Sequence, residues 1–113
     1  MIINLTPDEI VFCKDGDAEK GYDYDVVKII PPCGLVARLT GKNNWIGEVD
    51  GIPIFKAAYR KIEGLPEPQD GVVYVVSTLV KQQCRDRRDV LVPTNLIRDS
   101  AGNIIGCMAL GDI

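Results

Sequence analysis

The chain has 113 residues, so we expect residues 1–113 to form a single domain with one hydrophobic core. Its apolar fraction of 46% and charged fraction of 26% are ordinary for a globular protein, which excludes disorder for most of the chain. The net charge of −3 argues against a general nucleic-acid binder, because such domains are usually basic.

The first part of the chain is predicted to form short strands separated by turn residues. Asp50-Gly51 lies between two apolar runs, which is the strongest short-range hairpin signal in the sequence. Pro53 follows this turn and places its strand at a sheet edge, because proline has no N–H to donate. The strands predicted here are Ile2–Leu5, Ile10–Cys13, Val26–Ile30, Leu35–Leu39, Trp45–Val49 and Ile52–Tyr59.

The second part holds the most apolar run and the best helix start. After a connector rich in proline and glycine, Val72–Val76 is continuously apolar and predicts a central strand covered on both faces. Ser77 and Thr78 are suitable N-caps for a short helix over Leu79–Cys84. The strands that follow are Val90–Val92, which Pro93 is expected to end, Leu96–Arg98 and Ile104–Leu110.

These elements amount to eight or nine short strands and one clear helix. Turn signals recur every eight to twelve residues, which is typical of strand-rich folds. The strand–helix–strand unit over residues 72–92 favours an α+β fold over an all-β one. We therefore predict a β-rich α+β domain of mainly antiparallel short strands with one or two short helices.

The sequence lacks the residues of most enzymes. It contains no histidine, which excludes a Ser-His triad, a Cys-His pair and a His-ligated metal. It has neither a P-loop nor a dinucleotide-binding glycine motif. The four cysteines form no C-x-x-C pair, so reduced and mostly buried thiols are favoured over a zinc site: Cys13, Cys33, Cys84 and Cys107. We expect no catalytic residue, no metal and no cofactor.

The densest positive charge follows the predicted helix. Lys81, Arg85, Arg87 and Arg88 with Asp86 give residues 81–88 four bases and one acid, a net charge of +3. Cations at this end of a helix complement its dipole, which alone would account for them. Arginine side chains also bind phosphate through two parallel hydrogen bonds, so the same turn is a candidate anion site. Its charge suits a small anion better than a polymer backbone.

Other side chains are candidate ligand contacts beside this turn. Arg60 and Arg98 lie near strand ends and could converge on it, and Asn95 either forms a turn or reads a base or ribose. Thr78 either caps the helix or lies beside a bound phosphate. The aromatic residues are foremost core or sheet residues, but an exposed one could stack on a purine, and Tyr59 and Phe55 are the candidates.

Several segments resemble a family of small proteins from phages, prophages and bacterial genomes. They are INLTP at 3–7, GEVDGIP at 47–53, GLPEP at 64–68, GVVYVVSTLV at 71–80, DVLVP at 89–93 and RDSAGNIIGC at 98–107. Many members have histidine after INLTP, where this chain has Asp8, so no role of that histidine is carried over. Within this group the chain looks similar to the first type of Thoeris anti-defence protein.

This resemblance implies a function. Such proteins bind cyclic ADP-ribose isomers made by immune enzymes, and some bind cyclic oligonucleotides. They sequester the signal without cleaving it and form homo-oligomers with sites between subunits. The expected ligand contacts are then Arg85, Arg87, Arg88, Arg60, Arg98, Asn95, Tyr59, Phe55 and Thr78.

Two alternatives stay open on the residues alone. The chain could be a phage structural or protein-interaction domain without a small ligand, which would show an apolar patch in place of a basic cleft. It could also be an enzyme that uses carboxylates or Cys107. No segment approaches the roughly 20 apolar residues of a membrane span, and no signal-peptide pattern opens the chain. We expect no membrane or nucleic-acid polymer as partner and a cytoplasmic location, in the host cell if the protein is phage-encoded.

Overall fold

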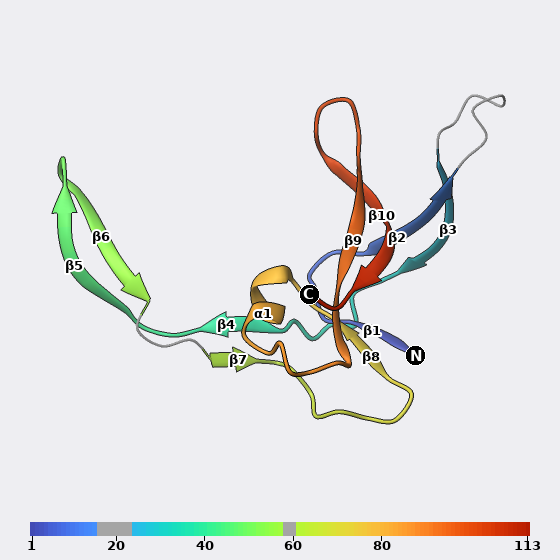
Figure 1. Cartoon of the computed structure of the whole chain (residues 1–113), viewed down its shortest axis with the longest axis horizontal. Helices are drawn as coiled ribbons and strands as arrows, with labels where there is room; N and C mark the ends of the chain where they lie inside the picture. The colour runs from blue at the N-terminus through green and yellow to red at the C-terminus, as the bar shows by residue number, and fades with distance from the viewer. Residues whose placement is uncertain (16–23, 58–60) are drawn as a thin grey trace.

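The computed structural model describes residues 1–15, 24–57 and 61–113 (Figure 1). Its elements in chain order are β1 (Ile2–Asn4), β2 (Ile10–Asp15), β3 (Tyr24–Ile30), β4 (Arg38–Thr40), β5 (Asn43–Val49), β6 (Ile52–Ala57), β7 (Lys61–Glu63), β8 (Val73–Val75), α1 (Thr78–Gln82), β9 (Val90–Arg98) and β10 (Ile104–Gly111). Two predicted site residues, Tyr59 and Arg60, lie outside the described residues.

The strands pair into one larger sheet and two ribbons. The larger sheet has the order β1-β8-β9-β10-β2-β3, while β4 pairs with β7 and β5 with β6. Within the described chain, four pairings are antiparallel and three are parallel. The predicted β-rich α+β class is therefore confirmed. The described helix is too short and polar to cross a bilayer.

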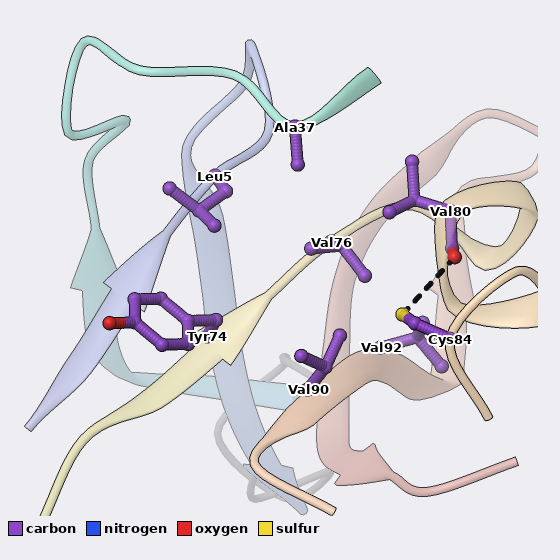
Figure 2. Packing of buried hydrophobic residues seen from close by; sticks show 8 residues of the cluster. All are labelled: Leu5, Ala37, Tyr74, Val76, Val80, Cys84, Val90 and Val92. Carbon is purple, nitrogen blue, oxygen red and sulfur yellow. Dashed lines mark hydrogen bonds between the residues drawn. The ribbon is translucent and has the colours of Figure 1, made fainter. Parts of the chain in front are cut away.

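Strand β8 lies at the centre of the packing. Tyr74 and Val76 point into a cluster with Leu5, Val90 and Val92, and helix α1 covers that cluster through Val80 and Cys84 (Figure 2). Val75 points the other way, into a smaller cluster with Ile10 and Cys107. Successive residues of a strand face opposite sides, so a continuous apolar run is what a strand between two cores requires. The predicted central strand is confirmed.

Helix α1 begins where the capping residues predict. The Ser77 hydroxyl accepts a hydrogen bond from the Val80 amide at 3.4 Å, which satisfies one of the amides left free in the first turn. The Cys84 thiol donates to the Val80 carbonyl at 3.3 Å (Figure 2). These contacts turn the chain from β8 towards β9 within a few residues.

Two strand predictions are corrected. Pro93 does not end a strand, since β9 runs through it from Val90 to Arg98. The Leu91 carbonyl oxygen accepts a hydrogen bond from the Val76 amide, and Pro93 lies beyond Leu91, the last residue of β9 in register with β8. The missing N–H of Pro93 therefore removes no hydrogen bond within that register. Of the predicted strand Leu35–Leu39, only Arg38 and Leu39 belong to β4. The segment before them does not pair in this ribbon, because the Ala37 amide donates its hydrogen bond to the Leu5 carbonyl.

Asn4 fixes the segment that follows β1. Its side chain is buried and donates to the carbonyls of Asp8 and Ile30 at 2.8 and 3.1 Å. Its oxygen accepts from the amide and hydroxyl of Thr6 at 2.9 and 2.7 Å. A buried amide with all its groups bonded is stable only in one arrangement, so Asn4 holds the turn over residues 6–8 against β3.

The β5–β6 hairpin, residues 43–57, projects from one end of the molecule and is called the arm below (Figure 1). Asp50 and Gly51 both have positive φ, 53° and 78°, as the predicted two-residue turn requires. The radius of gyration is 17.7 Å, against about 13 Å for a compact chain of this size. Neither hydrophobic cluster contains an arm residue. Among the described residues, the arm thus contributes no side chain to either core.

Gly64 provides a test of the packing between the connector and the segment before β4. A Cβ at Gly64 would collide with the Val36 carbonyl oxygen, and its φ of +81° is strained for any other residue. We expect Gly64→Ala to lower the free energy of unfolding by roughly 2–4 kcal/mol. Gly71→Ala is the matched control, because Gly71 has φ +72° but open space at its Cβ, and we expect a loss of about 1–2 kcal/mol. Urea unfolding that gives equal losses would contradict the predicted collision.

Candidate functional site

The four basic residues at the end of α1 and just after it lie on one tight segment. The amides of Cys84 and Arg87 donate to the carbonyls of Lys81 and Cys84, both at 3.0 Å, so the chain continues in short turns after the helix. The Arg87 carbonyl in turn accepts from the Val90 amide at 3.3 Å, which leads directly into β9. This segment, residues 81–89, is called the basic turn below. Its side chains divide into an inner and an outer pair.

Lys81 is the first inner residue, and its side chain is fully buried. Its Nζ lies 2.8 Å from a carboxylate oxygen of Asp112 and donates to the Arg87 carbonyl at 2.7 Å. A buried ammonium group requires such partners, since desolvation would otherwise strongly disfavour its charge. Asp112 thereby ties the C-terminal end of the chain to the basic turn.

Arg87 is the second inner residue. Its guanidinium forms two hydrogen bonds to the Asp89 carboxylate, at 2.8 and 2.7 Å, and a third to the Pro66 carbonyl at 3.1 Å. The hydrogen bonds between the two side chains lower the pKa of Asp89 and raise the pKa of Arg87. Arg87, predicted as a ligand contact, is already occupied in joining the turn to the connector that precedes β8.

Arg85 and Arg88 form the outer pair, and both are exposed. The described residues give Arg85 neither a hydrogen bond nor an ion pair. The Arg88 side chain is 86% exposed, and its Nη1 donates to the second Asp112 oxygen at 2.9 Å. A single carboxylate is thus bound between Lys81 Nζ and Arg88 Nη1. This arrangement, which we call the oxyanion seat, has the charge and donors that bind a phosphate oxygen.

The remaining predicted contacts do not gather on the basic turn. Arg98 donates to the Gly102 carbonyl at 2.9 Å and so closes the β9–β10 loop. Asn95 is exposed on β9 with a φ of +53°, a conformation that asparagine tolerates better than most residues. Phe55 is exposed on the arm, and Thr78 is exposed at the start of α1. Within the described residues, no hydrogen bond or ion pair joins any of these four to Arg85 or Arg88.

An open pocket of about 570 Å³ lies elsewhere on the body. It is bounded by the turn after β1 and by β2, β9, β10 and the end of β8, and Thr78 is its one lining residue among the predicted contacts. The lining is mostly apolar: Ile10, Val76, Leu96, Ile104, Ile105 and Cys107. Asp8 and Glu9 add negative charge. A phosphate would be repelled here, so this pocket and the cationic groups are separate features.

The two buried thiols are poorly suited to act as nucleophiles. All four cysteines are free, with Cys84 and Cys107 buried and Cys33 exposed. Burial raises the pKa of both buried thiols, which keeps them protonated and weakly nucleophilic. No group of three or more His, Cys, Asp or Glu side chains that could hold a metal occurs in the described ranges.

Sequence reasoning identified the basic turn but missed Asp112. Its partner Lys81 is 31 positions away, and no local spacing links the two. The only signal in the sequence for a buried Lys81 was its position next to the apolar Val80 in a short helix. The pocket was also missed, although its lining comes from the INLTP, VVSTLV, DVLVP and IIGC segments.

Comparisons with family models, with curated proteins and with solved structures found no match to this chain.

The Lys81–Asp112 pair should make stability depend on pH. Hydrogen bonds from Lys81 and then Arg88 lower the pKa of Asp112 in the folded chain. Its stabilising effect is therefore complete above the unfolded pKa, near 3.8, and is lost as pH falls through the lower folded pKa. We expect Asp112→Asn to unfold at lower urea concentration than the wild type at pH 7, and this difference to shrink as pH falls below about 4.

Two variants control this measurement. Asp70→Asn changes an exposed carboxylate in the connector and should cost little at any pH. Lys81→Met removes the buried charge together with its desolvation cost, so it should be milder than Asp112→Asn at pH 7. Equal destabilisation by Asp112→Asn at pH 7 and pH 3 would contradict a role for its charge.

Proposed function

We propose that this protein binds a small cyclic nucleotide signal, a cyclic ADP-ribose isomer and also cyclic oligonucleotides, and sequesters it without cleaving it. The observation that carries the proposal is the oxyanion seat, in which Lys81 and Arg88 hold a carboxylate at 2.8 and 2.9 Å. Carboxylate and phosphate oxygens accept the same charge-assisted hydrogen bonds. The resemblance described above supplies the ligand class.

The outer pair provides the anion contacts. Arg88 stays 86% exposed while one of its N–H groups holds Asp112, so the other donors of its guanidinium remain open to a ligand that approaches from solvent. Arg85 lies three positions earlier on the same turn and is exposed as well. Two guanidinium groups on a turn fixed by Lys81 and Arg87 suit a ligand that carries two phosphates.

Sequestration without cleavage fits the chemistry of the described residues. The sequence has no histidine, and its two buried thiols have raised pKa values. A protein that only binds needs complementary charge and shape, whereas cleavage of a phosphate or glycosidic bond needs a placed acid, base or metal. Binding is therefore the simpler assignment for these residues.

The site of a single chain lacks an aromatic platform beside the arginines. Trp45 and Phe55 are exposed on the arm, at a distance in the fold from the basic turn (Figure 1). In a homo-oligomer with sites between subunits, as the resemblance implies, one copy would supply the aromatic side chains and another copy the arginines. Phe55, Asn95, Arg98, Tyr59, Arg60 and Thr78 are accordingly proposed as contacts across such a boundary.

One observation favours a second candidate, a structural or protein-interaction domain without a small ligand. The arm exposes a set of large apolar side chains, as an interaction domain would. A binding experiment with nucleotides separates the two candidates, because only the first predicts uptake of a nucleotide.

Calorimetry with cyclic ADP-ribose isomers should show saturable binding to the purified protein. Arg88→Gln should weaken it about 10- to 100-fold, as expected for one charge-assisted hydrogen bond worth about 1.5–3 kcal/mol. Arg38→Gln is the matched control, because it removes another exposed arginine, on β4, that forms no ion pair with the basic turn in the described residues.

The fate of the ligand tests sequestration. Denaturing the loaded protein should release intact nucleotide, identified by chromatography and mass spectrometry. Recovery of a cleaved product would contradict the proposal and favour an enzyme. Absence of binding to both cyclic ADP-ribose isomers and cyclic oligonucleotides would favour the interaction domain.

A further inference from the structure

The arm carries apolar side chains on both of its faces. Val49, Ile52 and Ile54 share one face, since Val49 is opposite Ile52 in the register and residues two apart on a strand face the same side. Trp45 and Phe55 are opposite each other on the second face. A hairpin that packs only against the rest of its own chain needs a single apolar face. Two apolar faces indicate a hairpin enclosed by other protein.

The arm is not stable by its own contacts. A two-stranded hairpin alone is at best marginally stable in water. Six of its large side chains are 39–66% exposed: Trp45, Ile46, Val49, Ile52, Ile54 and Phe55. Because these side chains are spread over both faces, packing one face of the arm would still leave apolar side chains exposed on the other.

The body offers a matching acceptor. The pocket described above, called the groove from here on, has a mostly apolar lining, and its mouth includes Leu96, Ile104 and Ile105, which are 45–55% exposed. An aromatic anchor in such a hollow is the usual centre of a protein interface. Trp45 and Phe55 are side chains of that kind.

The charges also favour the pairing of the arm with the groove. The groove is flanked by Asp8 and Glu9. Lys56 and the adjoining Lys42 lie at the base of the arm, while the acids Glu48 and Asp50 lie near its tip. The three ion pairs of the described chain involve none of these residues. Opposite charges at the rim of an interface set its orientation and speed its formation.

The acceptor must belong to another molecule. Figure 1 shows the arm at one end of the chain, pointing away from β2, β9 and β10, with β4 and β7 between them. Each copy carries one arm and one groove, so two copies that exchange arms satisfy both features in a closed, two-fold assembly. A stable interface buries about 800 Å² on each partner, and in this exchange each copy contributes both its arm and its groove.

We infer that the arm, residues 43–57, docks in the groove of a second copy of this chain, with Trp45 and Phe55 as its anchors. The docking does not require a nucleotide. It can therefore fail or hold independently of the proposed function, and it is tested on the protein without ligand.

Oligomeric mass gives the first test. Light scattering at micromolar concentration should give the mass of at least two chains for the wild type. Trp45→Ser/Phe55→Ser on the arm and Leu96→Asp/Ile104→Asp in the groove should each give the mass of one chain. Val27→Ser, which changes a side chain 56% exposed on β3, is the matched control and should keep the wild-type mass.

Mixing the two variants identifies the contact. The arm variant keeps an intact groove, and the groove variant keeps an intact arm, so an equimolar mixture should regain a complex of two chains. Pairing of arm with arm predicts instead that the groove variant still associates and that mixing has no effect. That result, or a wild type with the mass of one chain, would overturn the inference.

Trp45 gives a second measurement that does not depend on how well the variants fold. It is the single tryptophan of the chain and is 62% exposed in one copy. Its emission should shift to shorter wavelength as the wild-type concentration rises, and acrylamide should quench it less. An emission typical of exposed tryptophan at every concentration would contradict docking.

Discussion

Burial of one strand on both faces is the constraint on which the rest of the body depends. Tyr74 and Val76 fill one cluster, and Val75 fills the other, so β8 cannot shift by one residue without exposing one core. Its neighbours β1 and β9 are fixed by parallel pairing to it. This places α1, and hence the basic turn, at one defined position directly after the strand.

The basic turn shows how a small domain holds several cations close together. Lys81 and Arg87 are directed inward and neutralised by Asp112 and Asp89. Those contacts order the turn, so that Arg85 and Arg88 are presented outward without first having to be ordered by a ligand. Preorganised donors bind an anion with less loss of conformational entropy. This is the property that a protein which captures a nucleotide requires.

Phe55 is proposed both as an anchor of the arm and as a contact to the ligand. Docking would bury Phe55 against a second copy, whereas stacking on a ligand would need one of its ring faces to remain accessible. Both uses require an assembly, because in one chain the aromatic side chains of the arm lie apart from the arginines of the body (Figure 1). On both proposals, the protein would act as a subunit whose surface is completed by another copy.

The sequence by itself determined the local features: the strands, the Asp50-Gly51 hairpin, the Ser77 cap and the buried run through β8. Each depends on neighbouring residues, on backbone preferences or on periodicity, and these are readable from a single chain. Only the tertiary structure decided that Pro93 lies inside a strand, that Asp112 pairs with Lys81, and that the arginines and the pocket are separate. Those outcomes depend on contacts between residues far apart in the chain, which no local pattern specifies.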